Sequence, residues 1–463
     1  MAYKRGQEVF RDPKPFSYIV FPKYRKIVCD WCLKMCENEE ILKACTKCKW
    51  VHYCNQTCQK EAWKSHHKLE CKYLQTQNKS KNVEKTFSGD FEEAQEIYLE
   101  LLRTTLKLKN NGRDEYFQLP NGKKRYFADL VSNADEIRKK YQMIYPSFYL
   151  TYEAFKIWLG DDAISSFDEL LEICGKWQTN CTNIKAANIE KRVSIGRALY
   201  LGFSGLDHSC APNAEYIENR KEILVRTIED VENFSDLRVS YSDPCGKTQE
   251  RRKYLKEKFF FDCKCVRCED PNSDAKVASL KCKSCPSWVH ESTKICSGCH
   301  QKLKLSDEEL TIVEKYKNGT LPKFEPTITI KEIRSILAKY VKIFHGFHEI
   351  FKQCMEVVRN HPIFALHYQQ RDRDANLLWL EFIKFKLNYS CGYLPQYFKY
   401  FVFLHLGVAG ECFSLKLFDE AIFHLKKAEE ICKVAYGEDY PYMQEIKGHI
   451  HNIQLHKARV GMI

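Results

Sequence analysis

The segment from Cys29 to Cys71 constrains this chain more than any other, because it is too short to build a hydrophobic core of its own. Its potential metal ligands come in closely spaced pairs: Cys29, Cys32, Cys45, Cys48, Cys54, Cys58, His67 and Cys71. Eight such ligands are enough for two tetrahedral zinc ions. Metal binding is therefore expected to supply much of the folding free energy. Both ions would be structural, since protein atoms fill every coordination position.

The number of cysteines and the hydropathy of the chain limit the classes of protein to which it can belong. The chain has 23 cysteines among 463 residues, many of them in Cys-x-x-Cys pairs. No hydrophobic run approaches the length of a membrane span, and residues 1–5 do not begin a signal peptide. We therefore expect a protein of the nucleus and cytoplasm with no membrane contact. In those compartments paired cysteines bind zinc rather than form disulfides.

The net charge of +12 arises from 73 Lys and Arg against 61 Asp and Glu. This excess is spread along the chain, so a solvated lysine-rich surface explains it most simply. Weak contact with DNA is the alternative for one basic group within the Cys29–Cys71 segment, because its lysines could bind phosphate. These lysines are Lys43, Lys47, Lys49, Lys60, Lys64, Lys68 and Lys72.

Two further cysteine clusters lie downstream. Cys263, Cys265 and Cys268 supply three thiolates, one short of a tetrahedral zinc site, and Cys210 completes the set if the two segments fold together. Such an ion would hold the aromatic run before Cys263 against the loop Leu206–Asn213. The second cluster has the spacing of a zinc ribbon and predicts another zinc site. Its ligands would be Cys282, Cys285, Cys296 and Cys299.

Helical spacing of apolar residues dominates the regions around these clusters. It predicts helices over Phe91–Lys109, near Phe127–Tyr141, over Tyr149–Leu159 and from Ser165 onward. From about Ser306 the pattern is helical to the end of the chain. Helix pairs of this kind stack as tetratricopeptide-like repeats, and a plain helical bundle is the alternative.

The order of Asp207-His208-Ser209-Cys210, a following Tyr241 and a Cys-x-Cys-x-x-Cys tail resembles the SET domain. The segment Cys29–Cys71, with Tyr53-Cys54 and its Trp63…His67…Glu70-Cys71 ending, resembles the MYND finger. The chain is thus similar to the SMYD family of SET and MYND domain-containing lysine methyltransferases. The family's interleaved pattern implies one zinc ion on Cys29, Cys32, Cys54 and Cys58, and the other on Cys45, Cys48, His67 and Cys71. The family's histidine spacing matches His66, whereas the spacing to Cys71 favours His67, which we choose.

The resemblance implies an α+β fold in which a β-rich SET domain is split by the finger. A helical insert, a Cys-rich post-SET region and a C-terminal helical TPR-like domain complete it. We place an N-terminal SET fragment at 1–28, the MYND finger at 29–71 and the SET domain with its insert at 72–245. The post-SET site and zinc ribbon follow at 246–305, and the helical domain at 306–463. In the family, the N-terminal part carries a glycine-rich cofactor turn, and this chain starts too late to contain it.

The function implied by the resemblance is S-adenosylmethionine-dependent N-methylation of a lysine in a histone or another protein. Tyr241 is the candidate catalytic residue, with its hydroxyl at the inner end of a narrow channel that desolvates the lysine amine. Phe259 would line that channel beside Tyr241. Cofactor contacts are expected from Asn180 in a short strand, Asp207, His208, Tyr241 and Phe261.

Departures from the family pattern leave a second function open. Asp207 replaces an asparagine, and an ionised carboxylate can only accept hydrogen bonds. Phe259 stands where the family often has tyrosine. The alternative is therefore a catalytically inactive scaffold that recruits protein partners, with a role in transcriptional regulation. In either case the finger is expected to bind proline-containing peptides, and the chain to be a monomer.

Overall fold

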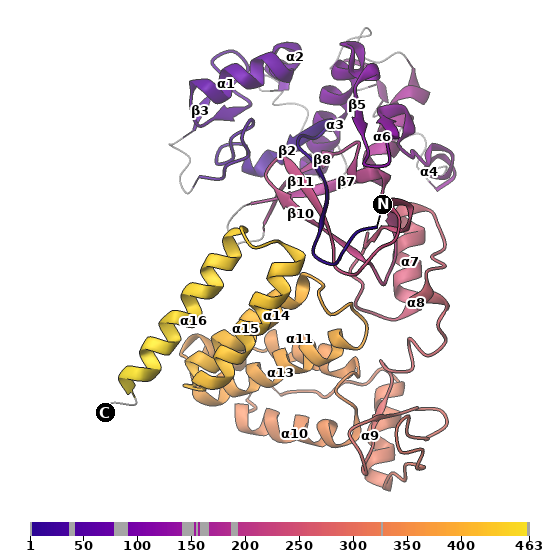
Figure 1. Ribbon diagram of the computed structural model, residues 1–463, viewed down its shortest axis with the longest axis vertical. Coiled ribbons are helices and arrows are strands. Elements are labelled where there is room, and N and C mark those ends of the chain that lie inside the picture. The colour runs from indigo at the N-terminus through magenta and orange to yellow at the C-terminus, as the bar shows by residue number, and fades with distance from the viewer. Residues whose placement is uncertain are drawn as a thin grey trace.

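The coordinates come from a computed structural model, and it describes residues 2–36, 42–77, 91–140, 152–153, 156–157, 166–186, 193–325 and 327–460. Figure 1 shows an elongated molecule with the zinc finger at one end and the C-terminal helices at the other. Small sheets lie between them. The predicted α+β fold is confirmed. Most of the helix expected over Tyr149–Leu159 falls outside the described residues.

Two three-stranded antiparallel sheets form the centre of the molecule. One has the order β1 (Glu8–Asp12), β11 (Glu222–Thr227) and β10 (Ala214–Asn219). The other has the order β2 (Ser17–Val20), β8 (Ser194–Leu199) and β7 (Cys181–Lys185). Runs of β-branched and aliphatic residues favour these strands, and their side chains fill one buried cluster. Its members include Val20, Ile184, Ile195, Ile223 and Val225.

A third pairing is parallel and joins segments about thirty residues apart. β9 (Asp207–His208) pairs with β12 (Arg238–Val239) in register. β12 is only two residues long, and Tyr241 lies just beyond its end. Asn213 stabilises this strand pair, because its Oδ1 accepts a hydrogen bond from the Arg238 amide at 2.8 Å.

The zinc finger is a small β-hairpin followed by a nearly continuous helix. β3 (Lys43–Ala44) and β4 (His52–Tyr53) precede α1 (Gln56–Ala62), a π-helical turn (Trp63–His67) and α2 (Lys68–Gln77). Asn55 caps α1 by accepting from the Cys58 amide at 2.9 Å. The residue that caps this helix is therefore bonded to the backbone of Cys58, one of the predicted zinc ligands.

The insert between the finger and β7 packs both units together. It contains α3 (Phe91–Lys109), β5 (Tyr116–Gln118), β6 (Lys124–Tyr126), α4 (Ala134–Lys140) and α6 (Phe167–Asn180). The predictions for α3 and for the start of α6 are confirmed, with Ser166 as the N-cap of α6. The helix expected near Phe127–Tyr141 is shorter, because a 3-10 turn and an extended stretch precede α4.

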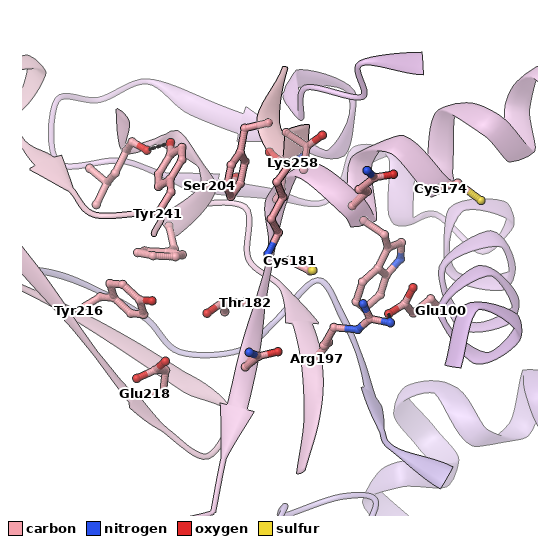
Figure 2. Close-up of a pocket in the computed structure, with 18 of the residues that line it drawn as sticks. Glu100, Cys174, Cys181, Thr182, Arg197, Ser204, Tyr216, Glu218, Tyr241 and Lys258 are labelled. Atoms are coloured by element: carbon pink, nitrogen blue, oxygen red, sulfur yellow. Dashed lines mark hydrogen bonds and ion pairs between the residues drawn. The ribbon is translucent and has the colours of Figure 1, made fainter. Parts of the chain in front are cut away.

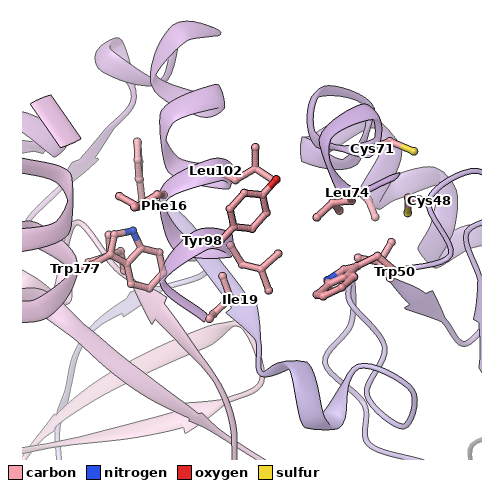
Figure 3. Packing of buried hydrophobic residues seen from close by; sticks show 14 of the residues in the cluster. Phe16, Ile19, Cys48, Trp50, Cys71, Leu74, Tyr98, Leu102 and Trp177 are labelled. Atoms are coloured by element: carbon pink, nitrogen blue, oxygen red, sulfur yellow. The ribbon is translucent and has the colours of Figure 1, made fainter. Parts of the chain in front are cut away.

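Figure 3 shows how α3 mediates between the finger and the sheets. Tyr98 and Leu102 of α3 face Leu74 and Trp50 of the finger, and all four side chains are buried. On its other side, α3 packs against β2 and α6. The finger therefore shares its core with the SET region, as its small size demands.

The rest of the chain runs from the post-SET region into the helical domain. Its elements are α7 (Thr248–Phe259), α8 (Val266–Glu269), β13 (Leu280–Lys281), β14 (Trp288–Val289), α9 (Asp307–Lys317), α10 (Ile330–Ile343), α11 (Ile350–Arg359), α12 (Pro362–Gln369), α13 (Arg373–Cys391), α14 (Tyr400–Ser414), α15 (Phe418–Ala435) and α16 (Pro441–Val460). The expected all-helical C-terminal region is confirmed. Among the described residues, no helix combines the length and apolar character that a membrane span requires.

The helical domain is fixed to the β10–β11 sheet. Leu224 and Ile217 of this sheet share a buried cluster with residues of α13, α14, α15 and α16. The ammonium of Lys399 lies 3.2 Å from the carboxylate of Glu215, and both side chains are largely buried. Arg226 donates to the Val434 carbonyl at 3.2 Å. The C-terminal helices are thus anchored next to the strand that carries Tyr216.

Candidate active site and zinc centres

The loop after β9 is held by its own short hydrogen bonds. The Ser209 amide donates to the Val239 carbonyl at 3.0 Å. The hydroxyl of Ser209 donates to the Ala211 carbonyl and accepts from the Ala211 amide, both at 3.0 Å. Ser209 is therefore a structural hydroxyl that shapes the loop.

Tyr241 is fixed at both ends by this loop. Its amide donates to Nδ1 of His208 at 3.0 Å, and its hydroxyl donates to the Leu206 carbonyl. Burial raises the pKa of Tyr241, and the nearby Asp207 carboxylate adds to this effect. The hydroxyl therefore stays protonated at neutral pH and has a defined direction.

Aromatic rings continue from Tyr241 on two sides. The ring of His208 lies 5.2 Å from that of Tyr241 and 5.9 Å from that of Phe261. On the other side, the ring of Phe259 lies 5.1 Å from Tyr241. Burial lowers the pKa of His208 to about 4, so its ring is neutral and its Nδ1 can accept the Tyr241 amide proton.

A cavity of about 540 Å³ lies beside Tyr241 (Figure 2). Three of the predicted site residues line it, namely Asn180, Tyr241 and Phe259. The other predicted contacts, Asp207, His208 and Phe261, do not. Tyr241 lines the cavity and its ring also contacts His208, so it forms the wall between the cavity and the His208–Phe261 side.

The cysteines at 210, 263, 265 and 268 hold this wall together. In a tetrahedral site with Zn–S bonds of about 2.3 Å, neighbouring sulfurs lie about 3.8 Å apart. Cys210 Sγ lies 4.0 Å from Cys263 Sγ and 3.6 Å from Cys268 Sγ. Cys265 completes the group, whose ligand atoms all lie within 4.8 Å of one another. The arrangement fits one zinc ion and brings Phe259 and Phe261 to the His208 loop.

The other predicted ligand sets also come together with zinc-like spacing. In the finger, Cys54 Sγ lies 3.6 Å from Cys32 Sγ and 3.3 Å from Cys58 Sγ, with Cys29 in the same group. The second set unites Cys45, Cys48, His67 and Cys71, with 3.6 Å between Cys48 Sγ and Nε2 of His67. The ribbon set is Cys282, Cys285, Cys296 and Cys299.

Comparison with known proteins agrees with this architecture. The MYND finger family model matches residues 29–71. The human histone-lysine N-methyltransferase SMYD3 is 31% identical over 275 residues, which cover 59% of this chain and 58% of SMYD3. The histone-lysine N-methyltransferase ASHR1 of Arabidopsis thaliana is 24% identical over 96% of this chain and 90% of its own length. Human N-lysine methyltransferase SMYD2 is 23% identical, over 97% and 94% respectively.

The finger match and these relatives together support the SMYD family of SET and MYND domain-containing proteins. Its match to SMYD3 spans a little over half the length of that relative. As in the name of the family, a MYND finger and the strands of a SET domain occur in one chain, and the finger and the cysteine clusters make it a zinc-binding protein.

Asn180 does not lie in a strand, which corrects the sequence prediction. It is the last residue of α6, and β7 begins at the next residue. Its side-chain amide donates to the carbonyls of Val131 and Lys176, each at 2.8 Å. Both donor hydrogens are therefore used, and Oδ1 is the atom left for a ligand in the cavity.

Asp207 is exposed, and its place in the site differs from that of the residues around it. Its backbone pairs with β12, whereas its carboxylate faces solvent outside the cavity lining. Arg125 of β6 is close enough to feel the charges of Asp207 and Tyr241. Arg125 also donates to the Ser204 carbonyl at 3.2 Å. A positive charge thus partly offsets the unusual carboxylate.

Other cavity residues carry no motif that sequence reasoning could use. They come from α3, α6, β7, β8 and α7, and include Glu100, Cys174, Trp177, Arg197 and Lys258. Arg197 forms an ion pair with Glu100 at 2.8 Å. Only the packing of α3 and α6 against the strands brings these side chains to one place.

His66 and His67 have different roles in the finger. His67 joins the second ligand set, as chosen from the sequence. His66 instead lies 3.1 Å from a carboxylate oxygen of Asp30, in a buried group with Glu70 and Arg103. The Arg103 guanidinium pairs with both carboxylates of this group and offsets part of their charge. Cys36 is buried and belongs to none of the ligand sets in the described part of the chain.

Proposed function

We propose that this chain is an S-adenosylmethionine-dependent protein-lysine N-methyltransferase, acting on a histone or another protein. The observation that carries the proposal is the fixation of Tyr241, whose amide is bound to His208 and whose hydroxyl is bound to the Leu206 carbonyl. This places a protonated phenol in the wall of a cavity, next to Phe259. A hydroxyl with a defined direction can orient an incoming amine.

The residues around this wall fit the cofactor. His208, Tyr241 and Phe261 form a group of adjacent rings that suits a flat adenine. Oδ1 of Asn180 is available to accept from an ammonium group. Asp207 could pair with the same ammonium group from its exposed position. When bound, S-adenosylmethionine supplies a methyl group on a sulfonium, which a neutral amine can attack.

The chain's own residues must deliver the lysine as a neutral amine. A free lysine has a pKa of about 10.4, so the amine is charged in water at neutral pH. Contact with the rings of Tyr241 and Phe259 removes water and lowers that pKa. Tyr241 then orients the amine, and Phe259 limits the width of the channel. With phenylalanine at 259 the channel has one hydroxyl fewer than a tyrosine would give.

We further propose four structural zinc ions, two in the finger, one on Cys210 with the Cys263–Cys268 thiolates, and one in the ribbon. The third ion supports the reaction indirectly, because it fixes Phe259 and Phe261 against the His208 loop. We also propose that the finger binds proline-containing peptides. Its exposed lysines suit weak contact with DNA, and Trp63 is partly exposed on the same unit. We propose a monomer of the nucleus and cytoplasm.

Calorimetry with S-adenosylmethionine and a methylation assay on histones and cell extract test the proposal. The parent protein is expected to bind the cofactor and to transfer methyl groups to lysine. Tyr241→Phe removes the hydroxyl and is expected to lower the turnover rate about 100-fold while cofactor affinity changes little. Its melting temperature serves as the control for folding. A variant as active as the parent would refute the role of Tyr241.

An inactive scaffold is the second candidate, and Asp207 is the observation that favours it. A parent protein with no measurable cofactor affinity, not restored by Asp207→Asn, would replace the enzymatic proposal by this one. Binding partners would then be sought through the finger and the C-terminal helices.

A further inference from the structure

The cavity beside Tyr241 contains three positively charged side chains, and they differ in their partners. Arg197 is paired with Glu100 at 2.8 Å and with Glu96 at 3.2 Å. Lys185 lies 3.9 Å from the carboxylate of Glu218. The charges at these two places are therefore largely balanced within the protein, and neither requires an anion from a ligand.

Lys258 is different. Within the described part of the chain, its amine contacts two rings, those of Tyr254 at 5.8 Å and Phe259 at 5.4 Å, and no carboxylate lies within ion-pair distance. Figure 2 shows the side chain reaching from α7 into the cavity, with its amine near Cys181. Lys258 and Cys181 both line this cavity.

The distance between Lys258 and Tyr241 determines which residues of a bound peptide the amine of Lys258 can contact. The ring of Phe259 lies 5.1 Å from the ring of Tyr241 and 5.4 Å from the amine of Lys258. An extended peptide advances about 3.5 Å per residue. The amine is therefore no more than about three residues away from a lysine whose own amine meets Tyr241. Because the side chain of Lys258 is exposed, a peptide crossing the cavity mouth can contact it.

We propose that Lys258 selects substrates carrying an acidic side chain within about three residues of the target lysine. This inference rests on the proposed methyltransferase function and adds the class of sequence that the site accepts. The acidic side chain would supply the carboxylate that Lys258 lacks, while Arg197 and Lys185 keep their own partners. Like charges meeting at the cavity mouth would also disfavour a basic residue at the same place.

A series of peptides that differ in the charge of one side chain tests this proposal. Each peptide carries one lysine in a neutral background, and a glutamate is moved through the three positions on either side. At the best position glutamate is then replaced by glutamine, lysine or phosphoserine. Methylation rates give kcat/KM, and fluorescence anisotropy of labelled peptides gives affinity in parallel. The proteins are the full-length parent, Lys258→Glu, and Lys253→Glu as a control of equal charge change.

Lys253 is a matched control because it lies on the same helix, is exposed, pairs with Glu257 and does not line the cavity. For the parent and Lys253→Glu, we expect kcat/KM about three- to tenfold higher with glutamate than with glutamine, and lower again with lysine. This preference should shrink in high salt. Lys258→Glu should reverse the order, so that the lysine peptide becomes the best of the series.

Two results would overturn the proposal: a parent without preference among the four peptides, or a glutamate preference that survives in Lys258→Glu. A preference for phosphoserine that Lys258→Glu abolishes supports recognition of negative charge as such. If no peptide is methylated by any variant, the proposed reaction fails. The peptide affinities then test the role of Lys258 separately, since charge-dependent binding does not require turnover.

Discussion

The guanidinium of Arg103 donates two hydrogen bonds to the carboxylate of Glu70. They measure 2.8 Å from Nε to Oε2 and 2.7 Å from an Nη atom to Oε1. The same guanidinium contacts Asp30 of the finger and the carbonyl of Tyr18 in β2. Glu70 in turn lies 3.3 Å from Nδ1 of His67, whose Nε2 faces Cys48. A single arginine of α3 therefore links a zinc ligand to the central sheet.

Replacing Arg103 by methionine should destabilise this link strongly. It would leave two buried carboxylates without their cation, which costs about 3 to 5 kcal/mol when one partner of a buried pair is removed. Carboxylates that orient a ligating histidine also raise its metal affinity. We therefore expect a lower free energy of unfolding, measured with urea, and faster zinc release to a chelator.

The control for this experiment is Arg113→Met. Arg113 pairs with Glu169 at 2.7 Å, but its side chain is 65% exposed. Such a pair contributes less than about 1 kcal/mol. Equal destabilisation by the two variants would contradict a special role for Arg103 in joining the finger to the sheets.

Asp207→Asn should have a small effect on cofactor affinity. The carboxylate is exposed, so water screens its interaction with any bound ligand, and Arg125 already offsets part of its charge. We expect a change in dissociation constant of less than about fivefold, measured by calorimetry with S-adenosylmethionine. A gain of more than tenfold would mean that Asp207 faces the cofactor directly and opposes its binding.

The ribbon cysteines should support the helical domain as well as bind metal. Leu280 and Val289, which flank these cysteines, share a buried cluster with Ile333 and Phe344 of the helical domain. Cys285→Ala is expected to reduce the zinc content by one ion per chain, measured by atomic emission, and to lower the melting temperature. Cys391→Ala is the control, because Cys391 is exposed and outside the ligand sets of the described residues. An unchanged zinc content in Cys285→Ala would refute the fourth site.

Much of the fold could be predicted from the sequence because metal ligands and helix caps act over short distances. The spacing within the pairs Cys29–Cys32 and Cys282–Cys285 is enough to predict zinc binding. Ser166 caps α6 where a serine before an acidic turn predicts it. Even the choice of His67 over His66 followed from its spacing to Cys71. In each case, the residues that decide the structure lie within a few positions of one another.

The cavity could not be predicted in the same way. Glu100, Arg197 and Lys258 meet only after α3, β8 and α7 have packed together, and none of them belongs to a recognisable pattern. The family resemblance predicts Asn180 in a short strand, yet α6 continues through it. Its position at the helix end commits its amide to backbone carbonyls. Tertiary packing, rather than local preference, decides which atoms of these residues remain available.

Asp12 provides a test of how burial acts on a charge in the SET region. Its side chain is buried, and Oδ2 accepts from the Gly202 amide at 2.8 Å and the Phe203 amide at 3.3 Å. Burial outweighs these hydrogen bonds and raises the pKa of Asp12 from 3.8 to about 6. The folded state therefore binds this proton more tightly than the unfolded state does.

The sign of the pH effect follows from that difference. The raised pKa contributes stability that is fully present below about pH 4 and is lost as pH rises through about 6. Processes that do not involve Asp12, such as zinc loss, act on both proteins alike, so the comparison is made with Asp12→Asn in the same zinc buffer. Between pH 8 and pH 5, the parent should gain about 1 to 2 kcal/mol in free energy of unfolding relative to Asp12→Asn. Urea unfolding of both proteins at these pH values measures the gain. Parallel stability curves would show that the carboxylate of Asp12 is solvated in the folded protein and that its contacts with the Gly202 turn do not bury its charge.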